Sequence, residues 1–159
     1  MSRSLKVILM SILVVMVFTG AVFAQSIFIY GRGGDSVRLD PADITDGESV
    51  KVCNQIFETL VRFKENSTEV EPGLARSWEI SEDGLTWTFH LRENVKFHDG
   101  TPFNADAVVF SLERQMDEEH PAHEGDFAYW SYMYNNVEKV WKTGEYSVKI
   151  KLDGPYAPF

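Results

Sequence analysis

The feature that most constrains the fold is a strict alternation of apolar and polar residues over residues 85–92. Its apolar members stand two residues apart and are all large: Leu85, Trp87, Phe89 and Leu91. Such alternation is typical of a β-strand with one buried face. An Asp83-Gly84 step precedes the strand, and the apolar Trp78 and Ile80 alternate before that step. Because Asp-Gly is a preferred hairpin turn, the sequence predicts two antiparallel strands joined there.

A second turn and a helix follow this hairpin. The string Phe97-His98-Asp99-Gly100 has the composition of a turn, in which we expect Asp99 to accept hydrogen bonds from nearby backbone N–H groups. Asn104 is a good N-cap residue. Beyond it, apolar residues recur at helical spacing: Ala105, Val108, Val109, Leu112 and Met116. The sequence therefore predicts a helix packed through this stripe, and a later hairpin over residues 137–152 around Thr143-Gly144-Glu145.

The residues before the first hairpin predict shorter elements. Residues 26–30 (SIFIY) are rich in β-forming side chains and predict an opening strand. The spacing of Thr45 and Glu48 matches a capping box at the start of a helix. The apolar stripe expected on that helix contains four residues: Cys53, Ile56, Phe57 and Leu60. We expect a short strand at residues 61–63 and a helical turn at residues 72–75.

Residues 75–103, ARSWEISEDGLTWTFHLRENVKFHDGTPF, closely resemble the signature segment of the family 5 extracellular solute-binding proteins. These are the peptide- and nickel-type receptors of ABC importers, and a string of this length is poorly explained by chance. The resemblance implies a mixed α/β (α+β) fold of the type II periplasmic binding proteins, whose two lobes close on a solute. It also implies docking of the closed form on the permease subunits of the importer, with neither enzymatic activity nor a cofactor.

The N-terminus has the pattern of a cleaved signal peptide. Arg3 and Lys6 precede an apolar run over residues 7–18, and small residues end at Ala24. The run is shorter than the roughly 20 residues that a spanning helix needs. We therefore expect removal of residues 1–24, no stable membrane insertion, and Gln25 as the first mature residue. Without a cysteine at this point for lipid attachment, the periplasm is the expected location.

Charge and length further limit the partners and the extent of the fold that the sequence predicts. Residues 1–24 contain two of the 15 basic residues and no acidic one, so their removal changes the formal charge from −9 to −11. An acidic surface disfavours nucleic acid and anionic lipid as partners.

The single cysteine, Cys53, has no internal disulfide partner and is expected to be a small buried hydrophobe. Residues 25–159 are enough for one domain core but cover about a quarter of the family's length. We therefore expect the N-terminal part of the first lobe, truncated, of a receptor that is monomeric when full length.

The first candidate site lies at the end of the predicted opening strand: Tyr30, Gly31, Arg32 and Gly33. Glycines permit close backbone approach, and in similar receptors the end of the first strand borders the ligand cleft. The alternatives are an ordinary exit from a strand into a loop and a dinucleotide-binding turn. The second alternative is disfavoured, because the spacing of a Gly-x-Gly-x-x-Gly motif is missing.

The second candidate site is the aromatic run over residues 127–134, in which the resemblance favours Tyr129 and Tyr132 as ligand-binding residues. Amphipathic aromatic side chains suit a pocket that tolerates varied ligands. Aromatic core packing between the lobes is the alternative interpretation.

No catalytic or metal site is expected. His120 and His123 flank Pro121, which prevents their presentation one turn apart on a helix, and the carboxylates around them fit a solvated loop over residues 117–126. A secreted enzyme and an inactive fragment remain the alternatives to a transport receptor. The sequence leaves the solute open among a short peptide, a nickel chelate, an oligosaccharide and an opine, with peptide as the first candidate.

Overall fold

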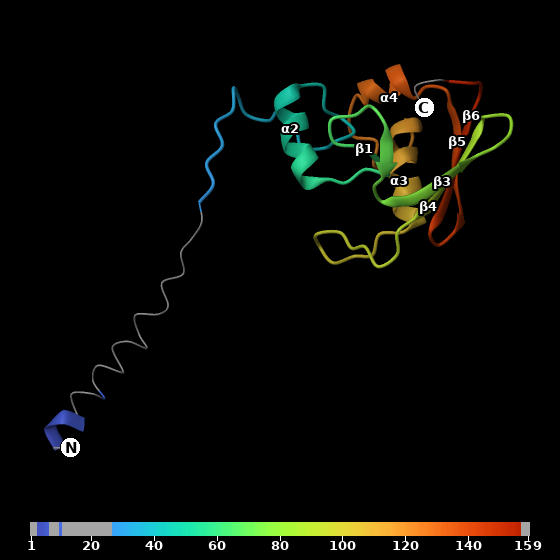
Figure 1. The fold of residues 1–159 in the computed structure, drawn as a ribbon. Coiled ribbons are helices and arrows are strands. Elements are labelled where there is room, and N and C mark those ends of the chain that lie inside the picture. Colours follow the sequence, from blue (N-terminus) through green and yellow to red (C-terminus); the bar gives the residue numbers. More distant parts are fainter. Residues whose placement is uncertain (1–2, 7–9, 11–26, 157–159) are drawn as a thin grey trace. The chain divides into compact units, whose positions relative to one another are not determined.

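Figure 1 shows the computed structural model, which describes residues 3–6, 10 and 27–156. The chain divides into two compact units, Met1–Arg32 and Gly33–Phe159. Most of the expected signal peptide lies outside the described residues, and its residues 3–6 and 10 are helical.

The second unit is built on a four-stranded antiparallel sheet with the order β3-β4-β6-β5. Its strands are β3 (Ala75–Ile80), β4 (Thr86–Leu91), β5 (Val137–Gly144) and β6 (Ser147–Leu152). Both predicted hairpins are confirmed. The first turns at Gly84, whose φ of +72° favours glycine. The second turns at residues 145–146, slightly later than the Thr143-Gly144-Glu145 step predicts.

The alternation along β4 does place its large apolar side chains on the core face. Phe89 is 7% exposed, Leu91 is fully buried, and Phe89 lies opposite the buried Val148 of β6. Trp87 is partly buried and stacks on Phe89, with 6.4 Å between the ring centroids. The sheet and its core therefore follow directly from period-two patterning.

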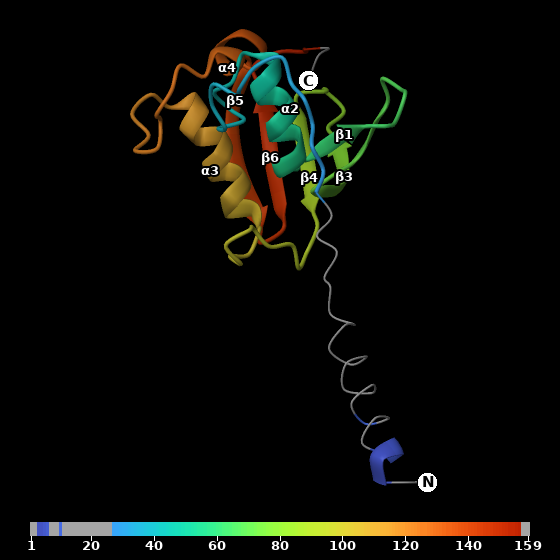
Figure 2. The same cartoon turned by 90° about the vertical axis from the view of Figure 1, so that its left-hand side faces the viewer.

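The helices are α2 (Gly47–Ile56), α3 (Ala105–Met116) and α4 (Ala128–Met133). Figures 1 and 2 show α2 and α3 on the same side of the sheet, and α3 packs on β5 and β6. The predicted N-cap of α3 is confirmed, because the Asn104 side chain accepts a hydrogen bond from the Ala107 N–H at 3.2 Å. The predicted stripe is also confirmed, since Ala105 and Val108 are buried and its other members pack against the core.

The start of α2 differs from its prediction. The N-cap residue is Asp46, whose carboxylate accepts from the Ser49 N–H at 2.8 Å, so the Thr45–Glu48 capping box is wrong. Aspartate at this position reaches the N–H three residues ahead as well as threonine could. The expected stripe is wrong beyond Cys53. Cys53 is buried, but Ile56 is exposed, and α2 ends at Ile56, so Phe57 and Leu60 lie outside the helix.

A two-stranded sheet of β1 (Val61–Phe63) and β2 (Val70–Pro72) leads into β3. The strand at residues 61–63 is confirmed, but the helical turn predicted at residues 72–75 is wrong. Gly73 there donates its N–H to the Leu60 carbonyl at 3.1 Å, and a Cβ on Gly73 would collide with the Thr59 carbonyl. This close backbone approach, rather than a helical turn, explains the glycine.

The opening strand expected at residues 26–30 is also wrong over its described part. Residues 27–30 form no strand, and the side chains of Ile27, Phe28 and Ile29 are exposed. A β-strand needs a hydrogen-bonded neighbour in addition to side chains of high β-propensity. High β-propensity alone did not decide its conformation.

Candidate functional site

The aromatic run over residues 127–134 forms the short helix α4, which sequence patterning did not predict. Its side chains divide into two groups. Phe127 is 1% exposed and Trp130 is buried, whereas Tyr129 is 46% and Tyr132 is 82% exposed. The core-packing interpretation thus applies to Phe127 and Trp130. The two candidate tyrosines, three residues apart on the helix, remain available for contact with a solute.

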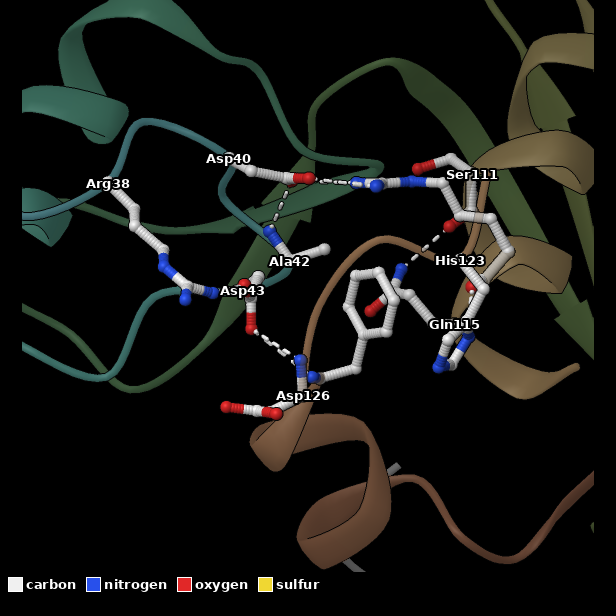
Figure 3. Close-up of polar contacts among 10 residues, drawn as sticks. Arg38, Asp40, Ala42, Asp43, Ser111, Gln115, His123 and Asp126 are labelled. Carbon is white, nitrogen blue, oxygen red and sulfur yellow. Dashed lines mark hydrogen bonds and ion pairs between the residues drawn. The ribbon is translucent and has the colours of Figure 1, made fainter. Parts of the chain in front are cut away.

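The turn into α4 is held by a carboxylate from a distant part of the chain (Figure 3). The Asp43 side chain accepts hydrogen bonds from the backbone N–H groups of Asp126 at 3.1 Å and Phe127 at 3.2 Å. It also forms an ion pair with Arg38 and is itself only 7% exposed. Phe127 has φ 38° and ψ 47°, a left-handed conformation that is unusual for a residue with a Cβ. Asp43 therefore holds the backbone at the residue whose conformation is unfavourable, Phe127.

The side chains of Arg114 and His123 support the Phe127 ring. The Arg114 guanidinium lies 5.3 Å from the ring centroid, and the His123 ring packs edge-on at 4.7 Å. Arg114 donates two hydrogen bonds to Asp40, at 2.8 and 2.7 Å. The His123 Nδ1–H donates to the Arg114 carbonyl oxygen at 2.8 Å. Cation–π and edge-on ring contacts both stabilise such an arrangement.

The Asp40–Arg114 pair is electrostatically matched. The hydrogen bonds from Arg114 hold the pKa of the Asp40 carboxyl below its ordinary value, and the Ala42 N–H adds to this effect. The same hydrogen bonds raise the pKa of Arg114. Both groups therefore stay charged near neutral pH, which favours the bidentate geometry.

A shallow groove of about 820 Å³ is lined by Arg38, Asp40, Asp43 and Arg114, together with residues that include Phe110 and Gly125. Asp40 and Arg114 bond each other, and Asp43 bonds Arg38 and two backbone N–H groups. The charges are thus used to join three chain segments: residues 38–43, the end of α3, and the loop before α4. We call this set of contacts, made by Arg38, Asp40, Asp43 and Arg114, the clasp.

The structure brings together only some of the predicted site residues. Tyr129 and Tyr132 share α4, whereas Tyr30, Gly31 and Arg32 belong to the first unit, in which the Tyr30 ring stacks on Phe28. Gly33 belongs to the second unit, where an added Cβ would lie 3.6 Å from Oε1 of Glu48, a residue in the first turn of α2.

His120 and Asp99 have structural partners. His120 accepts from the Ala122 N–H at 3.1 Å, and Asp99 accepts from the N–H and hydroxyl of Thr101, as its position in a turn predicts. Among the described residues, no group of three or more His, Cys, Asp or Glu side chains could hold a metal ion. Burial raises the pKa of the Cys53 thiol.

Sequence reasoning missed Asp43 and Arg114 as structural centres. The Phe127 N–H lies 84 residues after Asp43, and Asp40 lies 74 residues before Arg114. No local sequence motif predicts contacts over such separations. The one available signal is a basic residue at the end of an amphipathic helix, and that is more often explained by the helix dipole.

No helix in the described part of the chain has the length and apolar character needed to cross a membrane.

The sequence model described as "Bacterial extracellular solute-binding proteins, family 5 Middle" matches residues 69–159, more than half of the chain. The chain belongs to this family. Heme-binding protein A of Haemophilus influenzae is 40% identical over 148 residues, which cover 86% of this chain and 27% of that protein. The dipeptide-binding protein of Escherichia coli K12 is 38% identical, with 92% of this chain and 30% of that protein covered.

Solved structures of the family agree with this assignment. HbpA2 from Haemophilus parasuis has a TM-score of 0.73 at 40% identity, covering 79% of this chain and 27% of that one. DppA from Helicobacter pylori in complex with the peptide STSA has a TM-score of 0.71 at 40% identity, covering 80% and 27%. The mixed α/β fold of this family is therefore confirmed. The chain spans between a quarter and a third of the length of these relatives.

Proposed function

We propose that this chain forms part of the substrate-binding component of an ABC importer, which captures a small solute and delivers it to the permease. The observation that carries the proposal is membership of the family 5 solute-binding proteins, supported by TM-scores above 0.7 to two of its solved members. In such a receptor, closure of two lobes on the solute shifts the population toward the form that docks on the permease.

A short peptide is the first candidate solute. The relatives include the dipeptide-binding protein of Escherichia coli and di/tripeptide-binding protein 1 of Pseudomonas aeruginosa, and the Helicobacter pylori relative was solved with a bound peptide. Heme is a second candidate, since the 40% identical relative from Haemophilus influenzae is named for heme binding. A nickel chelate is a third, because NikZ of Campylobacter jejuni, 34% identical, was solved with Ni(L-His).

The remaining features of the proposal concern place and contacts. Residues 1–24 direct export and are removed, so that residues 25–159 act in the periplasm as part of a monomeric, non-enzymatic receptor. Tyr129 and Tyr132, exposed on α4, contact the solute. The backbone of residues 30–33 is a separate candidate for contact with it. An exposed tyrosine pair supports contact with varied side chains, because each ring offers apolar area and a polar tip.

A chimeric receptor tests the proposal. Residues 25–159 replace the matching segment of the Escherichia coli dipeptide-binding protein, and binding of the dipeptide Met-Leu is measured by isothermal titration. We expect a cooperatively melting chimera with a dissociation constant within about tenfold of the parent protein. A folded chimera that takes up no dipeptide would count against peptide as the solute, and heme and Ni(L-His) are then titrated in turn. A folded chimera that binds none of the three contradicts the receptor function.

A further inference from the structure

Helix α4 is short and begins without a side-chain cap of its own. It has six residues, and its N-cap residue is Phe127, an apolar side chain that cannot accept a hydrogen bond. Isolated helices of this length are not stable, because nucleation is unfavourable. The direction of α4 must therefore come from contacts with other parts of the chain.

The backbone at Phe127 is the point where that direction is set. Its left-handed conformation turns the chain from the loop into the helix, and a residue with a Cβ keeps such a conformation only where its surroundings hold it. The Phe127 ring is buried between Arg114 and His123, while its N–H is bound by Asp43. Both the side chain and the backbone of this residue are thus fixed.

Asp43 is packed closely enough to act as a fixed point. Its carboxylate is 7% exposed, binds two successive N–H groups and is paired with Arg38. Gly125 lies against it, and a Cβ on Gly125 would be 2.6 Å from the Asp43 Cγ. Such a distance is too short for real atoms, so any side chain at residue 125 would displace the carboxylate.

We propose that Asp43 is a positioning residue that fixes the turn at Phe127 and thereby sets the direction in which α4 presents Tyr129 and Tyr132. The effect on solute binding rests on the proposed function, in which these tyrosines contact the solute. The effect on α4 itself does not, because it follows from the hydrogen bonds of the Asp43 carboxylate.

Hydrogen exchange on the full chain tests the positioning role directly. The Ser131 and Tyr134 N–H groups donate to the Phe127 and Trp130 carbonyls, so they report on α4. In Asp43→Ala we expect these two amides to exchange at least about tenfold faster, while amides of β4 and β6 keep their wild-type rates. Unchanged rates in α4, or an equal loss of protection throughout the sheet, would overturn the proposal.

Two further variants separate positioning from a general loss of stability. Gly125→Ala keeps Asp43 but pushes its carboxylate away, and we expect the same acceleration confined to α4. Asp46→Ala is the matched control, since Asp46 is also an aspartate that binds a backbone N–H at a helix start, but in α2. Its effect should stay in α2. If Gly125→Ala leaves α4 protected, the carboxylate does not set the helix.

The chimeric receptor adds a binding readout. Asp43→Ala and Gly125→Ala should each weaken Met-Leu binding by about tenfold or more relative to the unsubstituted chimera, whereas Asp46→Ala should not. If the folded, unsubstituted chimera binds none of the three solutes, the proposed function is at fault, and the exchange data on the full chain still decide the positioning role. If the chimera binds and Asp43→Ala frees α4 without loss of affinity, Asp43 does not position the solute-binding residues.

Discussion

The β3–β4 hairpin and the turn into α4 are stabilised by contacts of opposite range. In the hairpin, Ile80 lies opposite Trp87 and Trp78 opposite Phe89, so the paired residues are close in sequence and apolar. In the turn, the Asp43 carboxylate reaches 84 residues ahead to the Phe127 N–H, and Asp40 reaches 74 residues ahead to Arg114. Those contacts are polar and directional.

The difference explains which region can be foreseen. An apolar alternation marks a buried face whatever strand lies beside it, because burial is non-directional. A charged contact needs specific atoms within hydrogen-bond distance, and losing one partner leaves the other unsatisfied. The hairpin should therefore carry most of the stability of the second unit, and the turn should carry its local geometry.

The largest expected effect is in the hairpin. Phe89→Ala should lower the free energy of unfolding by about 3–5 kcal/mol, because it removes a large buried ring from the core. Urea unfolding followed by circular dichroism measures this change. Thr88→Ala is the control, since Thr88 faces away from Phe89 on the same strand, and it should cost less than about 1 kcal/mol. A loss below about 1 kcal/mol in Phe89→Ala would mean that the alternation does not mark the core.

Substitutions in the clasp should lower the free energy of unfolding less than Phe89→Ala does. Arg114→Ala removes two hydrogen bonds to Asp40 and the contact with the Phe127 ring, and we expect a loss of about 1–2 kcal/mol. Arg114→Lys keeps the charge but not the bidentate geometry, so it should restore only part of the loss. Lys51→Ala, which breaks an exposed pair with Glu48, is the comparison and should change stability by less than about 0.5 kcal/mol. If Arg114→Ala were as mild as Lys51→Ala, the two regions would not differ as argued.

Some local features of the fold could be predicted from the sequence, and these depend on neighbours within a few residues. The N-cap at Asn104, the stripe of α3 and the Asp99 turn are of this kind. The wrong predictions, at residues 27–30 and 72–75, concern features that depend on another segment of the chain. A strand requires a partner, and Gly73 requires the approach of the Leu60 carbonyl, which no local pattern states.

The candidate site was foreseen less well than the fold. Composition marked residues 127–134 as aromatic, but it could not divide Phe127 and Trp130, which are buried, from Tyr129 and Tyr132, which are exposed. That division follows from the direction of α4. The direction depends in turn on Asp43, whose role is visible only when residues 43 and 127 are adjacent in space.

The Asn104 N-cap of α3 is a local polar contact, and its loss should lower the free energy of unfolding by less than Phe89→Ala or Arg114→Ala does. Asn104→Ala should lower the free energy of unfolding by about 1 kcal/mol, because the Ala107 N–H loses its partner at the start of α3. Asn104→Asp should be close to neutral, since a carboxylate accepts the same hydrogen bond and interacts well with the helix dipole. Urea unfolding of both variants measures the pair. Equal losses for alanine and aspartate would show that the cap does not stabilise α3.

The smallest expected effect concerns pH and the clasp. The pKa of Asp40 is lowered in the folded protein from its ordinary value of 3.8, mainly by hydrogen bonds from Arg114. A lowered pKa means that the unfolded chain binds the proton more tightly, so folding is favoured while Asp40 is ionised in both states. This contribution is complete above the unfolded pKa and is lost as the pH falls through the lower folded pKa.

Acid unfolding of a single variant isolates this contribution from that of other carboxyls. Asp46, Asp83 and Asp99 also have lowered pKa values, so the wild type loses stability in acid for several reasons. Asp40→Asn has no titrating group at residue 40. It should be less stable than the wild type near neutral pH, and the difference should shrink as the pH falls below about 4. Because Asp40 is partly exposed, solvent screening should keep the difference modest. A difference that stays constant from neutral pH into acid would show that the Asp40 charge adds nothing, and that the clasp at the turn acts through geometry alone.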